Sequence, residues 1–153
     1  MANDRQFKTK TLFVATRGVE EYRKSIDEYI ASKDIVLEIG CEWGTTSELI
    51  LPKCKTLIAT DVSSECIERA KQMRPNIDFR TLDVYDIRKA LSWKIDFNKM
   101  YIDVSGLSGY RSLLDVISLM DMYAKVFEMD AIVIKSGSLK NFIKNCRNYN
   151  PLA

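Results

Sequence analysis

The chain has 153 residues, of which 46% are hydrophobic and 29% are charged, with a formal net charge of +2 and no histidine. This length and composition indicate one globular domain with a single core. Without an imidazole, hydrolases built on serine–histidine or cysteine–histidine pairs are excluded, and a transition-metal centre is disfavoured. We therefore expect any proton transfer to use Asp, Glu, Lys, Tyr or Cys.

The sequence also bears on compartment and redox chemistry. No apolar run approaches the roughly 18–20 residues that cross a membrane, and the first residues lack the apolar segment of a signal peptide. We therefore expect a cytoplasmic protein without a membrane partner. The cysteines have neither zinc-site spacing nor the density of a disulfide scaffold, so we expect no metal site and four reduced thiols, at Cys41, Cys54, Cys66 and Cys146.

Taken in chain order, the sequence starts with a mostly polar stretch, 1–16, which is expected to be an N-terminal arm ahead of one domain over 17–153. Apolar segments of strand and helix length then alternate. The predicted strands are 35–39, 56–60, 76–82, 99–102 and 131–134, and the predicted helices are 17–32, a short one ending near Pro52, 63–73, 85–91, 110–127 and a last one capped by Ser136. This alternation predicts an α/β fold with a doubly wound, mainly parallel sheet of about five strands in the order 3-2-1-4-5, with helices on both faces.

The loop after the first predicted strand contains two glycines, Gly40 and Gly44, and leads into the run Thr45-Thr46-Ser47-Glu48. This run fits a capping box with Thr45 at the N-cap and Glu48 reaching back. Gly40 can adopt backbone angles closed to other residues, and Gly44 would let a ligand or a helix approach the main chain. The pattern is typical of a ligand-binding strand–loop–helix turn, although any α/β protein can contain such a turn.

Charged side chains follow four of the predicted strands: Asp61, Asp83, Asp103 and Lys135. Ligands of doubly wound sheets bind past the carboxyl ends of the strands. Asp61 lies 21 residues after Gly40, the spacing at which a second-strand carboxylate reaches the hydroxyls of an adenosine ribose. NAD-binding proteins share this spacing, but they would also have a G-x-G-x-x-G loop.

The motif Glu38-x-Gly40-x-x-x-Gly44 after a buried strand resembles the first motif of class I S-adenosylmethionine-dependent methyltransferases, which are Rossmann-like. It departs from their commoner pattern by having Glu42 in place of a middle glycine. The resemblance implies that S-adenosylmethionine binds with Glu38 at its methionine end, Asp61 on the ribose and Asp83 on the adenine. The full implied cofactor-binding set is Glu38, Gly40, Cys41, Glu42, Gly44, Asp61, Val62, Asp83, Val84 and Asp103.

Segments 101–106 and 132–136 resemble strands four and five of the FtsJ-type and fibrillarin-type RNA 2′-O-methyltransferases. In those enzymes a lysine-aspartate-lysine-glutamate set holds the ribose hydroxyl. The resemblance implies catalytic roles for Asp103 and Lys135, with Lys24 as the best candidate for the first lysine. Those families have two more strands after the last helix, and the glutamate comes from that region. Either this sequence is a shortened piece of such an enzyme, or the fold ends at five strands. In the second case the fifth strand is expected at an edge, where a partner or a second copy of the chain would cover it.

Residues 131–153 contain basic side chains and no acid, which predicts RNA contacts through Lys140, Lys144 and Arg147, although a solvated helix face would have the same charge. Three functions stay open. The favoured one is an RNA ribose methyltransferase. The second is a catechol-type small-molecule O-methyltransferase, which would need Mg²⁺ on acids where this chain has Lys135-Ser136. The third is a non-catalytic S-adenosylmethionine-binding module.

Overall fold

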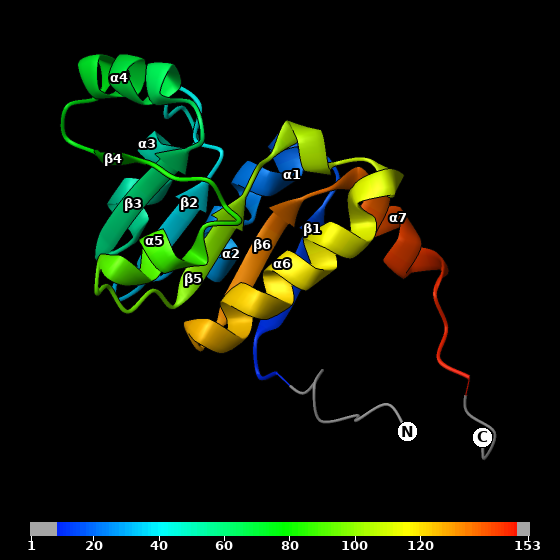
Figure 1. Ribbon diagram of the computed structural model, residues 1–153. Coiled ribbons are helices and arrows are strands. Elements are labelled where there is room, and N and C mark those ends of the chain that lie inside the picture. Colours follow the sequence, from blue (N-terminus) through cyan, green and yellow to red (C-terminus); the bar gives the residue numbers. More distant parts are fainter. Residues whose placement is uncertain (1–8, 150–153) are drawn as a thin grey trace.

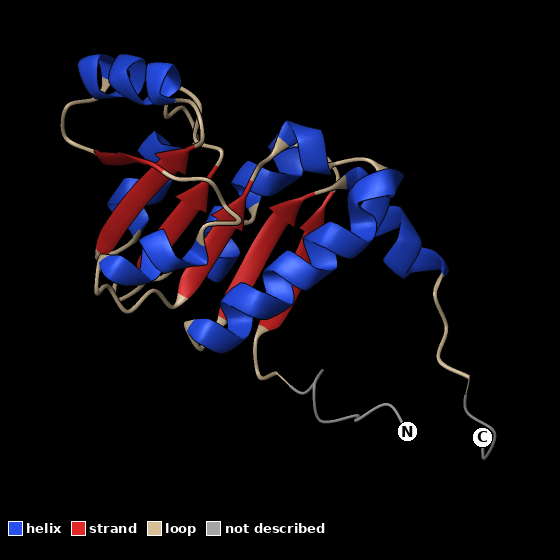
Figure 2. Cartoon of the chain, viewed as in Figure 1, coloured by secondary structure: helices blue, strands red, loops and turns tan. Residues whose placement is uncertain are grey.

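In the computed structural model of the chain, residues 9–149 are described, and they form a six-stranded parallel sheet with helices on both faces (Figures 1 and 2). The strand order is β1-β6-β5-β2-β3-β4. The strands are β1 (Leu12–Thr16), β2 (Ile35–Ile39), β3 (Thr56–Asp61), β4 (Asp78–Thr81), β5 (Lys99–Ile102) and β6 (Ala131–Lys135). The α-helices are α1 (Val19–Lys24), α2 (Ile26–Tyr29), α3 (Ser47–Ile50), α4 (Ser64–Met73), α5 (Ile87–Ser92), α6 (Leu113–Val126) and α7 (Gly137–Asn145), and the 3₁₀ turns are η2 (Leu51–Lys53), η3 (Ser105–Leu107) and η4 (Tyr110–Ser112).

The expectation of about five strands is wrong by one strand. The five predicted strands are β2 to β6 and keep their expected neighbours, but β1 adds a sixth strand beside β6. It forms within the stretch expected to be an arm, where the apolar run that begins at Leu12 suits a half-buried strand. β1 pairs with β6 in parallel, with Thr16 opposite Lys135. The chain itself therefore covers the strand edge that was expected to need a partner.

The helix predicted over 17–32 forms as two short helices, α1 and α2, that meet at Ser25. The Ser25 hydroxyl donates to the carbonyl oxygen of Tyr22 at 2.7 Å and lies 3.2 Å from the hydroxyl of Tyr101. A serine that bonds back to the preceding turn competes with the regular helical pattern and often bends a helix. Tyr22 and Ile26 both remain buried against the sheet, so the break does not expose the apolar stripe.

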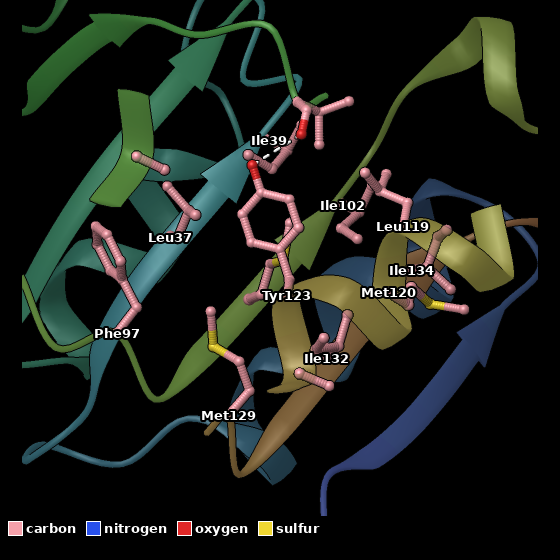
Figure 3. Close-up of a cluster of buried hydrophobic side chains, with 14 of the residues drawn as sticks. Leu37, Ile39, Phe97, Ile102, Leu119, Met120, Tyr123, Met129, Ile132 and Ile134 are labelled. Carbon is pink, nitrogen blue, oxygen red and sulfur yellow. Dashed lines mark hydrogen bonds between the residues drawn. The ribbon is translucent and has the colours of Figure 1, made fainter. Parts of the chain in front are cut away.

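Two hydrophobic cores sandwich the sheet, because successive side chains of a strand point to opposite faces. Leu37 and Ile39 of β2 belong to the core beneath α5 and α6 (Figure 3). Val36 belongs to the opposite core, which α1, α2 and α4 cover. In Figure 3 the hydroxyl of Tyr123 on α6 donates to the carbonyl oxygen of Val84 at 2.8 Å. This buried bond ties α6 to the loop after β4, close to the strand ends.

Gly40 provides a test of the fold, because it has a φ of +79° and stands against β5. A Cβ atom at this position would lie 1.9 Å from the carbonyl oxygen of Asp103. We expect Gly40→Ala to destabilise the protein by at least about 1–3 kcal/mol from backbone strain alone, measured by urea unfolding. Gly109→Ala is the matched control because no atom lies within 4 Å of its added methyl group. Equal unfolding midpoints for the two variants would contradict this packing.

Candidate functional site

The carboxyl ends of β2, β3, β4 and β5 surround a cavity of about 420 Å³. This volume is within the range of small-molecule sites. Its position past the strand ends is where ligands bind in doubly wound sheets. The cavity is lined by Ile39, Gly40, Asp61, Val62, Leu82, Asp83, Val84, Tyr85, Asp103, Val104, Ser105, Gly106 and Leu107. The strand-end acids predicted from the sequence therefore come together around one cavity.

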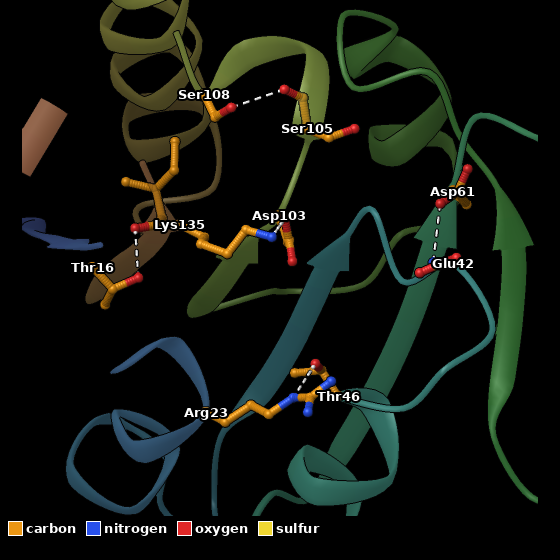
Figure 4. Close-up of polar contacts among 10 residues, drawn as sticks. Thr16, Arg23, Glu42, Thr46, Asp61, Asp103, Ser105, Ser108 and Lys135 are labelled. Atoms are coloured by element: carbon orange, nitrogen blue, oxygen red, sulfur yellow. Dashed lines mark hydrogen bonds and ion pairs between the residues drawn. The ribbon is translucent and has the colours of Figure 1, made fainter. Parts of the chain in front are cut away.

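Two of the lining carboxylates, those of Asp61 and Asp83, are held in place by backbone N–H groups. Asp61 accepts hydrogen bonds from the N–H of Glu42 at 3.0 Å and from that of Ser63 at 2.9 Å (Figure 4). Asp83 accepts from the N–H of Tyr85 at 3.0 Å. An ionised carboxylate offers about four acceptor sites. Each side chain is therefore positioned by the fold and still has acceptor capacity for the hydroxyl or amino groups of a ligand.

The loop after β2 bends sharply beside this cavity. The N–H groups of Gly40 and Cys41 both donate to the carbonyl oxygen of Thr60, at 2.8 and 2.9 Å. Glu42 has a φ of +49°, so the position that commonly holds a glycine is left-handed here as well. Gly44 leaves room for the ring of Phe79. Cys41 and Gly44 therefore shape the loop, whereas Gly40 also lines the cavity.

The predicted capping box is wrong. Thr46, and not Thr45, precedes the four-residue helix α3, and no side chain caps this helix. Glu48 instead forms an ion pair with Arg74 at 2.9 Å. Arg74 also donates to the carbonyl oxygen of Trp43 at 2.6 Å. The loop is therefore held from α4 and β4, and not by the local capping pattern in its sequence.

Glu38 is not a cavity-lining residue. It is 1% exposed and lies on the face of the sheet opposite to Leu37 and Ile39, where the hydroxyl of Ser47 donates to its carboxyl group at 2.5 Å. Burial raises the pKa of Glu38 to about 7; the Ser47 bond and the charge of Arg23 lower it, and the charge of Asp103 raises it. The Glu38 side chain therefore contacts the start of α3 on the opposite face of the sheet and not the cavity.

Glu38 belongs to a buried polar cluster that the sequence did not reveal. The hydroxyl of Tyr22 is buried and has no hydrogen-bond partner among residues 9–149. Burial raises the pKa of Tyr22, and the charges of Glu38 and Asp103 raise it further. Arg23 donates to the hydroxyl of Thr46 at 3.1 Å (Figure 4). This cluster joins α1 to the start of α3 beneath the loop.

An ion pair joins the ends of β5 and β6: Lys135 Nζ lies 2.5 Å from Asp103 Oδ1 (Figure 4). Both side chains are about one quarter exposed. Asp103 lines the cavity, so the lysine nitrogen stands beside it. Lys24, the third predicted catalytic residue, is three quarters exposed on α1 and pairs with Glu20 at 2.7 Å. Within residues 9–149, Lys24 forms no ion pair or hydrogen bond with Asp103 or Lys135.

The basic residues predicted to contact RNA lie away from the cavity. Lys140 on α7 pairs with Glu21 on α1 at 2.6 Å. Lys144 lines a separate groove between α7 and β1. Arg147 follows the end of α7 and is exposed. Their positive charge is thus partly neutralised and is spread along α7.

The cavity residues that were not predicted from the sequence are Ile39, Leu82, Tyr85, Val104, Ser105, Gly106 and Leu107. All of them lie within four residues of Gly40, Asp83 or Asp103 in the chain, so the strand-end rule could have found them. Beyond the cavity, all four cysteines are free thiols. No helix among residues 9–149 is long and apolar enough to cross a bilayer, and no cluster of potential metal ligands occurs in that range.

No protein-family model and no curated protein matches this chain. Solved structures do match: DesVI from Streptomyces venezuelae has a TM-score of 0.58 at 14% identity, over 76% of this chain and 51% of that one. CalS10, an amino pentose methyltransferase from Micromonospora echinaspora solved with S-adenosylmethionine bound, has a TM-score of 0.53 at 13% identity. The match covers 76% of this chain and 50% of CalS10. An S-adenosylmethionine-dependent methyltransferase from Clostridium acetobutylicum has a TM-score of 0.50 at 18% identity. The match covers 76% of this chain and 45% of that one.

The chain spans about half the length of these structures. Its described part has the Rossmann-like fold of class I S-adenosylmethionine-dependent methyltransferases. The narrower resemblance to FtsJ-type and fibrillarin-type RNA 2′-O-methyltransferases has no counterpart among these three structures.

The buried carboxyl group of Glu38 leads to a pH prediction. Its pKa is near 4.5 in the unfolded chain and about 7 in the fold, so the folded state binds the extra proton between these values. Stability should therefore fall as the pH rises through this window, on the order of 3 kcal/mol in total at about 1.4 kcal/mol per pKa unit. We expect Glu38→Gln, which stays neutral and can still accept from Ser47, to lack this loss in urea unfolding at about pH 5 and about pH 8. The same loss in both proteins would contradict the assignment.

Proposed function

We propose that this chain binds S-adenosylmethionine in the strand-end cavity and transfers its methyl group to a hydroxyl acceptor. The observation that carries this proposal is the charge of the cavity. Three carboxylates line it, those of Asp61, Asp83 and Asp103, and no lysine or arginine of residues 9–149 is among the lining residues. Such a site attracts a sulfonium cation, whereas it would repel the diphosphate of NAD.

The residues present fit this cofactor. The free acceptor sites of Asp61 suit the two ribose hydroxyls, and those of Asp83 suit the adenine amino group. Val62, Leu82 and Val84 supply apolar walls for a flat ring. In this proposal Glu38 supports the methionine end through Ser47 and does not touch the ligand, in contrast to the role that the motif resemblance implied.

When bound, the cofactor supplies an electrophilic methyl group on its sulfonium. The task left to the chain is to hold an acceptor hydroxyl in line and to take its proton, so positioning contributes most of the catalysis. We assign this proton to Lys135 Nζ, which lies beside the cavity and accepts it as a neutral amine, after the ammonium of the Asp103 ion pair has released a proton to solvent. Asp103, 2.5 Å away, orients this nitrogen and contacts the cofactor side of the site. We give Lys24 no part in this step, because it pairs with Glu20.

For the acceptor we propose the 2′-hydroxyl of an RNA ribose. The support is the aspartate–lysine pair at adjacent strand ends, on which the resemblance to RNA 2′-O-methyltransferases rests. A catechol-type acceptor is less well supported, because Mg²⁺ would need acidic ligands after β6, where the chain has Lys135 and Ser136. Phosphate contacts through Lys140, Lys144 and Arg147 remain a prediction from the sequence, and for Lys140 and Lys144 they are an alternative to the peptide site proposed below, whose experiment decides between the two.

We expect Lys135→Ala to abolish methyl transfer to RNA and to leave cofactor affinity nearly unchanged, because Lys135 acts on the acceptor. Transfer would be measured with tritiated S-adenosylmethionine and total RNA, with DNA and a panel of phenols as alternative acceptors. Cofactor affinity would be measured by calorimetry on the same samples.

Lys24→Ala is the matched control for this experiment: it removes a lysine that pairs with an acid outside the cavity, and it should keep full transfer. Label that enters phenols but never RNA would overturn the RNA acceptor and leave the methyltransferase proposal standing. Full activity of Lys135→Ala with loss in Lys24→Ala would reverse the catalytic assignment.

A further inference from the structure

β1 leaves one row of backbone groups at the edge of the sheet. The N–H of Leu12 donates to Asp130 and the carbonyl oxygen of Thr16 accepts from Ser136, so alternate residues of β1 bond toward β6. The N–H and C=O groups of Phe13 and Ala15 therefore point away from β6. Among residues 9–149, β1 is the last strand of the sheet on this side. The row has the spacing that another strand needs for pairing.

A groove runs beside the same two residues, between β1 and α7, which lie at the same end of the sheet in Figure 1. It encloses about 600 Å³, and its apolar wall consists of Phe13, Ala15 and Ile143. Phe13 is 38% exposed and Ile143 is 54% exposed. Apolar side chains and unpaired backbone thus occur side by side, which is the combination used in strand addition.

The rim of the groove is positively charged. Arg17, Lys140 and Lys144 line it, and Glu21 is the single acid among its lining residues. Glu21 already pairs with Lys140, and no ion pair of Lys144 occurs among residues 9–149. The chain from 131 to 149 contains no acidic residue at all. An occupant that complements this rim has to carry negative charge.

We propose that the β1 edge and the α7 groove bind an extended acidic peptide segment of a partner protein, which adds a strand beside β1. A second copy of this chain fits less well, because two-fold pairing of β1 strands would bring two basic α7 helices to the same seam. RNA also fits less well. It would leave the apolar wall and the outward N–H groups of Phe13 and Ala15 without partners.

The first test uses a fluorescent probe, a short peptide of alternating glutamate and valine, in anisotropy titrations with the full chain. We expect saturable binding that weakens at high salt. Two control peptides isolate the two features of the site. Replacing glutamate by lysine removes the charge match, and N-methylation of alternate amides removes the hydrogen bonds of an added strand. Both changes should weaken binding at least tenfold.

The second test changes the protein. Ala15→Pro deletes an outward N–H without touching the bonds to β6, and proline is tolerated at such edge positions. Lys144→Glu reverses one rim charge. Each variant should weaken peptide binding on the order of tenfold. Lys89 is exposed on α5, so Lys89→Glu is the matched charge reversal, and it should leave peptide binding unchanged. If Ala15→Pro lowers the thermal stability, Lys144→Glu and the N-methylated peptide still decide the question.

Three results would overturn the proposal. Equal binding of the N-methylated peptide would exclude strand addition. Binding of a single-stranded RNA oligomer that displaces the peptide and is lost in Lys144→Glu would assign the groove to nucleic acid. Self-association of the chain that Ala15→Pro prevents would assign the edge to a second copy. None of these outcomes depends on methyl transfer, so the test stands apart from the proposed activity.

Discussion

The site depends on the close contact between Gly40 and the end of β5. The N–H of Asp103 donates to the carbonyl oxygen of Ile39, and Gly40 then stands against the Asp103 carbonyl with no room for a side chain. Because β2 lies between β3 and β5, this contact decides where the loop leaves the sheet. The N–H of Glu42 in that loop reaches Asp61 on β3. One backbone contact thus positions carboxylates from the two strands that flank β2 around the cavity.

The sequence was sufficient for the parts of the site that follow from periodicity. Parallel strands end at the same edge of a sheet, so Asp61, Asp83 and Asp103 could be placed together from their positions alone. Lys135 followed in the same way. The structure brings it to Asp103 because β5 and β6 are adjacent and in register.

The rest depends on tertiary packing that a single sequence does not encode locally. The Glu38 carboxyl group has Ser47 as its partner because α3 lies against the face of the sheet to which Glu38 points. Lys24 and Arg23 are adjacent on α1, where consecutive side chains point about 100° apart. Arg23 reaches Thr46, whereas Lys24 lies in solvent beside Glu20. β1 is a five-residue strand, and its pairing with β6 spans more than a hundred residues of chain. Such long-range pairing leaves little trace in local periodicity.

The central claim is that the acid-lined cavity binds S-adenosylmethionine, and calorimetry with Asp61→Ala tests it most directly. We predict that the parent chain binds S-adenosylmethionine and S-adenosylhomocysteine but not NAD, and that Asp61→Ala weakens binding by about 1–3 kcal/mol. Asp78→Ala is the control. It removes a carboxylate on β4 that pairs with Arg80 of the same strand, and this variant should bind S-adenosylmethionine like the parent. Unchanged affinity in Asp61→Ala, or tighter binding of NAD than of S-adenosylmethionine, would contradict the account.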